Sequence, residues 1–429
     1  MSKETYSHPY HLLFLSGNKE KAVSDLAHKY IDHLAIHTDQ RIEDICYTSA
    51  IEGSHLQFRS AVLCKDREDL SATLSLLIEG KRSVNYILGE TVTSNKLLFL
   101  YTGQGSQYLS MGKQLYETSP IFRKSLKSCA AEIDRYIDRP LLSVLFGKDD
   151  RILNNTRFTQ PAIYAIQFAL GKLWLSWGIK PDAVVGHSVG EFAAACMAGI
   201  FSMEEGARLI SERARLMSSL PAGGGMAALM IPRETAEQYI EPYTDDISIA
   251  ACNGPDNTVV SGKSQVLSKL YKRLDKEKIL YRELKVSHAF HSALMDPILE
   301  EFREVAGDIQ LSAPHIPIIS DVSGDLGGDE MLESKYWSEH IRKPVQFFDS
   351  MKTTKKIGCT VYLEIGPNPV LLGMGRKCIK VEESEWLPSM RHNKGDWEQM
   401  LSSLGKLYVR GNSPDWEGLF THYPTNKNP

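Results

Sequence analysis

Residues 183–192 read AVVGHSVGEF, a stretch that joins an apolar run to an alanine-rich helical segment. The pentapeptide at 186–190 fits the glycine-x-serine-x-glycine pattern of a nucleophile elbow, a tight turn between a strand and a helix. Gly186 and Gly190 leave room where the strand and helix pack closely, and the turn holds Ser188 in a strained, exposed position. Free N–H groups at the start of the helix can stabilise an oxyanion. The stretch predicts a catalytic serine; the alternative is a tight turn without chemistry.

The composition is that of a globular protein with room for two or three domains. The chain has 429 residues, of which 42% are hydrophobic and 24% charged. Its formal net charge of −4 provides no electrostatic footprint for nucleic acid or an anionic membrane. We see neither a signal peptide at the N-terminus nor an apolar run long enough to span a membrane, so we expect a cytoplasmic protein.

The cysteines argue against a structural metal. There are seven, widely scattered, and no two form a Cys-x-x-Cys pair. Such an arrangement favours free thiols in a reducing compartment over a disulfide framework or a zinc site. We therefore expect no metal.

The order of predicted elements divides the chain into an α/β fold of several parts. Residues 1–95 read as a small α/β unit without a catalytic constellation, for which a structural or docking role is expected. A new strand begins at Lys96, and the alternation of strands and helices that follows favours a parallel sheet with helices on both faces. Residues 224–286 follow the order βαββαβ, which is typical of a ferredoxin-like domain inserted into the larger one. The tail predicts a short helix near Trp397 and Trp416.

A catalytic serine needs a base, and two histidines near the end of the inserted domain are the best candidates. His288 and His291 lie in VSHAFHS, residues 286–292, where the inserted domain returns to the main one. That junction would place a histidine at the mouth of a cleft between domains. We expect one of the two to activate Ser188.

Four motifs together resemble those of malonyl-type acyltransferases. They are GQGSQ (103–107), GHSVGE (186–191), ERARLM (212–217) and HAFHS (288–292). This family includes the acyltransferase domains of modular polyketide synthases and the malonyl-CoA:acyl-carrier-protein transacylases of fatty acid synthesis. The resemblance covers roughly residues 96–390 and is specific, because four separate motifs recur in the expected order and spacing.

The resemblance also implies how the chain divides into domains and subdomains. It divides the main domain into an α/β-hydrolase-like large subdomain (96–223 and 287–390) and the ferredoxin-like small subdomain (224–286). Residues 1–95 resemble the linker domain that joins ketosynthase to acyltransferase, and 391–429 look like the linker that follows the acyltransferase. The chain begins with methionine and shows no ketosynthase or carrier motif. It therefore resembles a discrete, trans-acting acyltransferase, or an excised didomain.

The resemblance assigns roles in catalysis. Ser188 would attack the thioester, and His291 would take its proton and later activate the carrier thiol. A backbone carbonyl orients the histidine in this family, and that position falls on His340. The backbone N–H groups of Gln104 and Val189 would form the oxyanion hole.

Further residues would contact the acyl group. Arg213 would pair with the free carboxylate of a malonyl unit. In the family, the sequence HAFH accompanies malonyl, because Phe290 would fill the space that an α-methyl branch needs; such a contact gives a preference only. His187 is expected to line the same pocket. His288, the first residue of HAFH, is expected to contact the substrate as well. For Gln160 and Asn253, which match family positions near the active site, substrate contact and a structural loop role both stay open.

The implied reaction moves a malonyl-type unit from malonyl-CoA through acyl-Ser188 to the phosphopantetheine thiol of an acyl carrier protein in polyketide biosynthesis. No bound cofactor is implied, since CoA or phosphopantetheine arrives with the substrates. A ketosynthase contact through the linker domain stays open. One alternative is a carrier-to-carrier transferase for an unusual extender such as aminomalonyl or hydroxymalonyl. A less favoured alternative is an esterase or thioesterase, against which stands the missing Asp or Glu of a triad.

Overall fold

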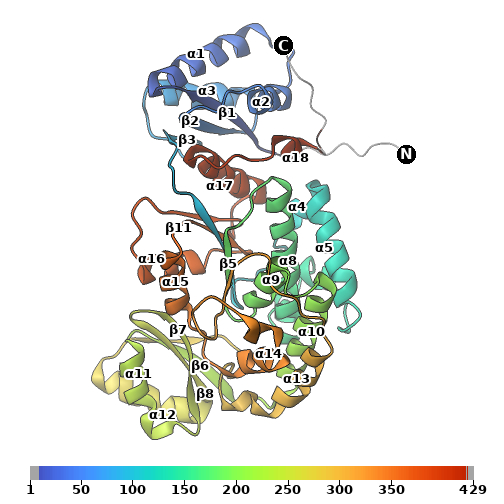
Figure 1. The fold of residues 1–429 in the computed structure, drawn as a ribbon, viewed down its shortest axis with the longest axis vertical. Coiled ribbons are helices and arrows are strands. Elements are labelled where there is room, and N and C mark those ends of the chain that lie inside the picture. The colour runs from blue at the N-terminus through green and yellow to red at the C-terminus, as the bar shows by residue number, and fades with distance from the viewer. Residues whose placement is uncertain (1–8, 422, 424–429) are drawn as a thin grey trace.

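The computed structural model describes residues 9–421 and 423, which form three sheets in three stacked layers (Figure 1). A three-stranded sheet at the N-terminal end lies above a five-stranded parallel sheet, and a four-stranded antiparallel sheet lies at the opposite end. The predicted fold class is confirmed: α/β, with a parallel main sheet and a ferredoxin-like insertion.

The N-terminal sheet, in the order β1-β2-β3, is antiparallel. Its elements are β1 (His11–Gly17), α1 (Glu20–Ile36), α2 (Ile42–Ile51), β2 (Phe58–Cys64), α3 (Arg67–Ile78) and β3 (Tyr86–Glu90). Strand β1 is buried on both faces, and its side chains alternate between two cores. Leu13 and Leu15 pack with residues of α1 and α3, whereas Leu12 and Phe14 join the large core of the molecule.

The C-terminal tail supplies the second cover of this sheet. It forms β12 (Glu385–Pro388), α17 (Asp396–Arg410) and α18 (Trp416–Phe420). The ring of Phe14 lies 4.8 Å from that of Tyr408 and 4.6 Å from that of Trp416, while Arg59 donates a hydrogen bond to the Tyr408 carbonyl. The expectation of one short helix was wrong. The tail helix α17 is 15 residues long, because one of its faces packs on the N-terminal sheet and another on the main domain.

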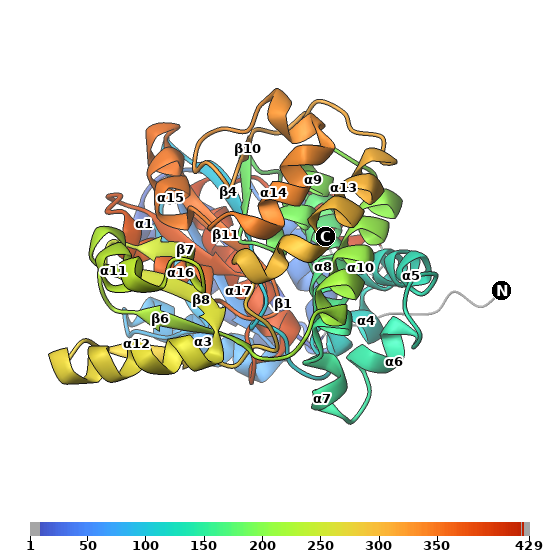
Figure 2. The same ribbon diagram turned by 90° about the horizontal axis from the view of Figure 1, so that it is seen from below.

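The main sheet has the order β10-β5-β4-β11-β12, and all its neighbouring strands are parallel. Its other strands are β4 (Lys96–Tyr101), β5 (Ala183–Gly186), β10 (Ile318–Ile319) and β11 (Cys359–Ile365). The helices before the insertion are α4 (Lys113–Thr118), α5 (Pro120–Ile133), α6 (Leu141–Leu145), α7 (Asp150–Leu153), α8 (Thr156–Ser176), α9 (Gly190–Ala198) and α10 (Met203–Ser219). After the insertion come α13 (Leu299–Gly307), α14 (Ser334–Arg342), α15 (Phe347–Lys356) and α16 (Leu371–Cys378), with the 3₁₀ turns Ala293–Ile298 and Asp329–Leu332. Viewed from below, α15 and α16 lie on one side of the sheet, and α8 and α10 on the other (Figure 2).

Parallel strands bring their carboxyl ends to one edge, where ligand sites of open α/β sheets lie. Three neighbouring strands, β10, β5 and β4, end at this edge. The chain continues from them into Asp321, Ser188 and Gln104 respectively. The topology thus gathers residues that are far apart in the sequence.

The small sheet has the order β7-β8-β6-β9, which is that of a ferredoxin-like fold. It comprises β6 (Gly224–Leu229), α11 (Arg233–Ile240), the 3₁₀ turn Glu241–Tyr243, β7 (Ile247–Gly254), β8 (Asn257–Lys263), α12 (Ser264–Glu277) and β9 (Tyr281–Leu284). Strand β7 is tied to the large subdomain through Val345, whose N–H donates to Ala250 and whose carbonyl accepts from Cys252. The two subdomains therefore meet beside the carboxyl edge of the main sheet.

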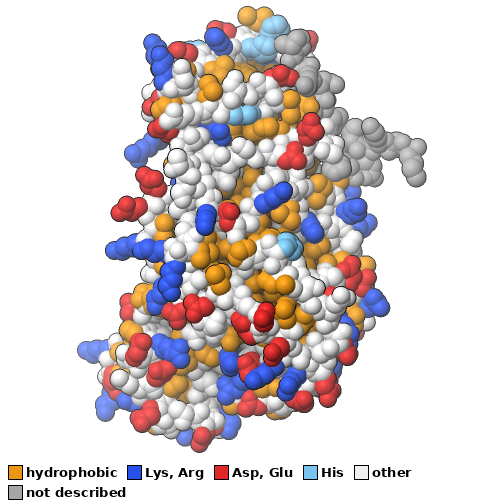
Figure 3. Space-filling view, in the orientation of Figure 1, with side chains coloured by type: hydrophobic (Ala, Val, Ile, Leu, Met, Phe, Trp, Pro, Cys, Tyr) orange, Lys and Arg blue, Asp and Glu red, His pale blue; other side chains and the backbone are white. Residues whose placement is uncertain are grey.

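Neither positive nor negative side chains predominate on the face of the molecule shown in Figure 3. Basic and acidic side chains intermingle there, and hydrophobic side chains gather over the middle of the molecule. Among the described residues, we find no helix with the length and apolar character needed to cross a bilayer.

Candidate active site

The elbow has the strained geometry that its sequence predicts. Ser188 has a φ of 51°, in the left-handed region that a side chain rarely adopts. A Cβ on Gly186 would lie 2.1 Å from the Glu191 nitrogen, and one on Gly190 would lie 2.2 Å from the Tyr101 oxygen. Gly186 therefore allows β5 to turn closely against the start of α9, and Gly190 allows α9 to approach the end of β4.

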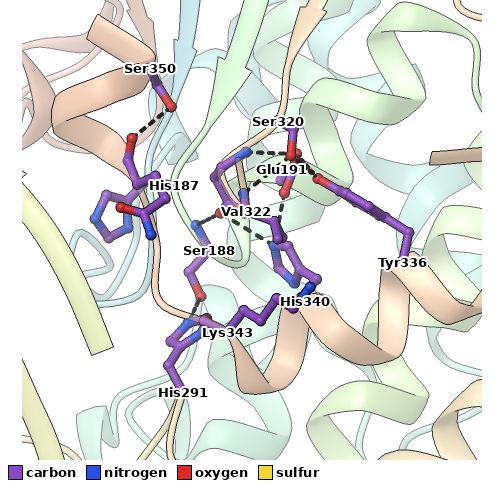
Figure 4. A network of polar contacts seen from close by, with 12 residues as sticks. His187, Ser188, Glu191, His291, Ser320, Val322, Tyr336, His340, Lys343 and Ser350 are labelled. Atoms are coloured by element: carbon purple, nitrogen blue, oxygen red, sulfur yellow. Dashed lines mark hydrogen bonds and ion pairs between the residues drawn. The ribbon is translucent and has the colours of Figure 1, made fainter. Parts of the chain in front are cut away.

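Ser188 and His291 meet at hydrogen-bond distance. Ser188 Oγ lies 2.8 Å from His291 Nε2, although the two residues are 103 positions apart (Figure 4). His291 Nδ1 lies 2.8 Å from the backbone carbonyl of Lys343. Because a carbonyl only accepts, it fixes the proton on Nδ1 and leaves Nε2 free to accept the serine proton.

The orienting carbonyl was assigned to the wrong residue. The family resemblance placed the orienting carbonyl at His340, but the carbonyl that contacts His291 belongs to Lys343, three residues further on. Helix α14 ends at Arg342, so the carbonyl of Lys343 is directed out of the helix and toward His291. His340 instead lies inside α14, with its ring centroid 6.2 Å from that of His291.

Burial keeps His291 neutral. It lowers the pKa of the imidazole to about 3, and the positive charges of Arg213 and His340 act in the same direction. A neutral imidazole is the form that can accept a proton.

Arg213, on α10, reaches the nucleophile from the other side. Its Nη2 lies 3.3 Å from Ser188 Oγ, and its Nη1 donates to Gln160 Oε1 at 2.6 Å. The side chain is buried, and burial lowers the pKa of the guanidinium to about 10, which still leaves it charged at neutral pH. Among the residues that the structure describes, no carboxylate pairs with it and its Nε has no hydrogen-bond partner. The Asp321 carboxylate raises the pKa of Arg213 but forms no ion pair with it. A buried cation without a directly paired anion is costly, so the site favours an incoming anion.

The other candidate residues surround this centre at different depths. His187 Nε2 lies 2.7 Å from Asn253 Oδ1, a contact that links the elbow to strand β7. Phe290 is buried, whereas His288 is half-exposed and lies 3.1 Å from the Leu220 carbonyl. The structure therefore brings His187 and Asn253 together and places His288 at the rim of the site.

Two backbone N–H groups remain available beside Ser188. Within the described part of the chain, neither Gln104 nor Val189 donates its N–H to a protein acceptor. Gln104 follows β4 and Val189 follows Ser188, so both lie in the loops at the carboxyl edge of the main sheet.

A buried charged group lies beneath the elbow, and the sequence analysis gave two of its members no role. It consists of Glu191, Asp321 and His340, which we call the charged trio. His340 Nε2 lies 3.0 Å from Glu191 Oε2 and 3.3 Å from Asp321 Oδ2. Burial alone would lower the pKa of His340, but the carboxylates of Asp321 and Glu191 outweigh it and raise that pKa to about 9. Glu191 is the last residue of the motif GHSVGE, whereas Asp321 lies in none of the four motifs found in the sequence.

The trio is better described as an ion-pair cluster than as an empty metal site. Its donor atoms lie within 4.8 Å of one another, a spacing that an ion could bridge. Asp321 Oδ2, however, already accepts the Ser188 N–H at 2.7 Å. The charge of protonated His340 can also balance a carboxylate directly.

Comparison with known families shows which family the chain belongs to. The acyl transferase domain family matches residues 98–414, and a family described as the C-terminal part of CurL-like polyketide synthases matches 11–74. The chain belongs to the acyl transferase domain family. The chain is 34% identical to polyketide synthase GfsA of Streptomyces halstedii over 95% of its length, and 36% identical to mycoketide-CoA synthase of Mycobacterium tuberculosis over 87%. It spans only 6% and 9% of those two proteins, respectively.

Solved structures agree with this assignment. The acyl transferase domain of ZmaA matches with a TM-score of 0.91 at 28% identity, covering 99% of both chains. The acyltransferase domain from the second module of the salinomycin polyketide synthase has a TM-score of 0.82 at 32% identity, covering 95% of both. The match to the malonyl CoA-acyl carrier protein transacylase of Clostridium perfringens covers 73% of this chain and 98% of the transacylase, at a TM-score of 0.66 and 26% identity.

Proposed function

We propose that this acyltransferase moves a malonyl-type unit from malonyl-CoA to the phosphopantetheine thiol of an acyl carrier protein in polyketide biosynthesis. The observation that carries the proposal is the buried Arg213, which lies 3.3 Å from Ser188 Oγ and has no counter-ion among the described residues. A nucleophile beside an unpaired guanidinium suits an acyl group that ends in a carboxylate.

The geometry supports a two-step reaction. As Ser188 Oγ attacks the thioester carbonyl, its proton passes to His291 Nε2, and the N–H groups of Gln104 and Val189 stabilise the oxyanion. Collapse of the tetrahedral intermediate expels the CoA thiolate, which takes the proton from His291. In the second step His291 removes the proton from the carrier thiol, and the resulting thiolate attacks the carbonyl of acyl-Ser188. The bond between the acyl group and Ser188 Oγ then breaks, Oγ takes the proton back from His291, and the acyl group leaves as the thioester of the carrier. The Lys343 carbonyl stabilises the imidazolium in both steps.

The same geometry speaks against an esterase. The partner of His291 Nδ1 is a backbone carbonyl, not the carboxylate of a hydrolase triad. Among the relatives, the acyl transferase domain of SpnD was solved as a complex with a substituted malonyl, 2-(pent-4-yn-1-yl)malonyl. A carrier-bound donor with an unusual extender fits Arg213 equally well, so it is the second candidate.

We also propose that the N-terminal unit is a linker domain. Four solved acyltransferase domains, two of them from the salinomycin polyketide synthase, match over 95–99% of this chain and therefore include a counterpart of the N-terminal unit. Other matches, to the acyltransferases of the avermectin synthase and PpsC and to the transacylase, cover only 70–73%. A carrier protein or a ketosynthase could dock on such a unit, and its packing against α17 would hold it in place.

Acyl transfer from a panel of donors tests the function. The wild-type protein is incubated with malonyl-CoA, acetyl-CoA, and malonyl-, aminomalonyl- and hydroxymalonyl-carrier proteins, and the intact mass is measured. We expect one malonyl group per chain from malonyl-CoA and little acetyl label. Label from carrier-bound donors alone would favour the second candidate, and label from none of them would contradict both.

The pH dependence of acylation should reflect the low pKa of His291. The base must be neutral, and burial lowers its pKa from 6.5 to about 3. Acylation should therefore hold as pH falls through 6.5 and decline only well below it. The measurement is the rate of Ser188 labelling by a fluorophosphonate at each pH, with circular dichroism to show that the fold persists. An acid limb centred near 6.5 would contradict the prediction.

A further inference from the structure

We propose that the charged trio of Glu191, Asp321 and His340 positions both members of the dyad, linking the backbone of Ser188 to the carbonyl that orients His291. The inference rests on the proposed Ser188–His291 dyad and assigns positioning roles to three residues that contact no substrate. Each of the three is at most 1% exposed.

The first arm of the network holds the nucleophile. Asp321 Oδ2 accepts a hydrogen bond from the Ser188 N–H at 2.7 Å. The backbone of Ser188 is strained, with a φ of 51°, and such a conformation persists only where its surroundings fix it. A charged acceptor on the nucleophile's own N–H supplies that constraint at the point where the strain lies (Figure 4).

The second arm holds the base. His340 lies in the last turn of α14, and Lys343 directly follows that helix. The Lys343 N–H is fixed by the Glu339 carbonyl at 2.7 Å, and its own carbonyl lies 2.8 Å from His291 Nδ1. Anchoring His340 therefore sets the place from which the orienting carbonyl reaches His291.

The carboxylates join the two arms. Glu191 belongs to α9, just after the elbow, and its Oε1 accepts from the Asp321 N–H at 3.1 Å and from the Tyr336 hydroxyl at 2.7 Å. Its Oε2 lies 3.0 Å from His340 Nε2. Tyr336 and His340 lie one turn apart on α14, so this helix contacts Glu191 at two points. Beyond Lys343, the Gln346 N–H donates to the Asp321 carbonyl at 2.6 Å. The segment that carries Lys343 is therefore also tied to Asp321 on its far side.

The arrangement predicts energetic coupling between Asp321 and His340. Burial and the charge of Asp321 raise the pKa of Glu191 to about 8, so the opposite charges at neutral pH are those of Asp321 and His340. Removing either of these two charges leaves the other buried without its partner, whereas removing both restores the balance and keeps polar groups in place. We therefore compare Asp321→Asn, His340→Gln and the double variant. The readout is the rate at which a fluorophosphonate labels Ser188, a reaction that needs the dyad but not Arg213.

We expect each single variant to label about 10- to 100-fold more slowly, since small misplacements of reacting groups can cost about 100-fold. The double variant should be less impaired than the product of the two losses. In single-turnover acylation by malonyl-CoA, the maximal rate should fall while the half-saturating concentration stays within about twofold, because Arg213 is untouched. Labelling of both single variants at the wild-type rate, or losses that simply multiply, would overturn the proposal.

Two further variants separate positioning from folding. Tyr336→Phe keeps all three residues of the trio and removes the hydrogen bonds of the hydroxyl with Glu191 and Ser320. A folded protein with labelling slowed about fivefold is expected; wild-type labelling would overturn the proposal. Glu364→Gln is the matched control. Glu364 is a carboxylate of equal burial whose oxygens accept from the N–H groups of Val370, Leu371 and Leu372. It lies on β11, which β4 separates from the elbow strand β5. Its labelling should stay within about twofold of wild type at equal folded fraction.

The same experiment distinguishes failure of the inference from failure of the proposed function. Ser188→Ala must abolish fluorophosphonate labelling if the dyad is assigned correctly, whatever the trio does. Elemental analysis of the purified wild-type protein provides the last arm. A stoichiometric transition metal that is lost in Asp321→Asn would overturn the ion-pair role of the trio while leaving the dyad standing.

Discussion

Replacing Ser188 by alanine is expected to abolish acyl transfer. Incubation of the wild-type protein with malonyl-CoA should add one malonyl mass, because Ser188 Oγ is the nucleophile that lies 2.8 Å from the His291 base. The substitution Ser188→Ala removes the atom that forms the covalent intermediate. Loss of a serine nucleophile in a hydrolase costs on the order of 10⁶-fold in turnover, and we expect a loss of similar size. Intact-mass spectrometry and transfer to a carrier protein measure both half-reactions.

The control for this substitution is Ser219→Ala. The Ser219 hydroxyl lies at the end of α10 and donates to the Leu216 carbonyl of the same helix, so its loss should leave acylation unchanged. His291→Ala should fail in both half-reactions, because the same imidazole serves each of them. Malonyl label on Ser188→Ala at the wild-type level would remove Ser188 from the mechanism.

Replacing Arg213 by alanine is expected to change which acyl groups are accepted. Malonyl transfer should fall roughly 30- to 4000-fold, because losing one partner of a buried charged pair costs about 2–5 kcal/mol. Acetyl transfer should hold or rise, since a neutral acyl group needs no counter-ion. Competition between malonyl-CoA and acetyl-CoA, followed by intact mass, gives the ratio directly.

Arg215 provides a matched control for this charge. It lies two residues further along α10, is more exposed, and pairs with Glu212 and Glu301. Arg215→Ala should leave the malonyl-to-acetyl ratio unchanged. Arg213→Lys should recover only part of the malonyl rate, because an ammonium group lacks the planar fork. Equal losses of malonyl and acetyl transfer in Arg213→Ala would indicate a structural arginine.

Local sequence signals predicted the parts of the fold that local physics determines. The apolar run before Gly186 and the alanine-rich segment after Gly190 form β5 and α9, and the βαββαβ order of residues 224–286 matches the inserted sheet. Elements that depend on distant partners were missed. Strand β3 has intermediate burial and pairs with β2 at the edge of its sheet, so its pattern is weak. The length of helix α17 was underestimated, because its two apolar faces are buried only by packing against the N-terminal sheet and the main domain, which are distant in sequence.

The candidate site divides in the same way. Ser188, His291 and Arg213 stand in motifs, and the structure brings them together. Lys343 contributes a backbone carbonyl, which leaves no side-chain signature in a sequence, so the position was assigned to a neighbouring histidine. Asp321 was missed because a single aspartate after a two-residue strand resembles any loop aspartate. Its contact with the Ser188 N–H arises from the neighbouring positions of β10 and β5 in the sheet.

The packing of α17 on the N-terminal sheet has a consequence for synthesis. Leu12 and Phe14 are made long before the helix that covers them, as the hydrogen-bonded pair His55 and Tyr408, 353 positions apart, illustrates. One apolar face of the nascent domain therefore stays uncovered until α17 is made, roughly 20–80 seconds later at about 5–20 residues per second. During this interval the uncovered sheet can bind other apolar surfaces. Chaperone demand and aggregation on overexpression should therefore depend on how soon α17 and α18 leave the ribosome.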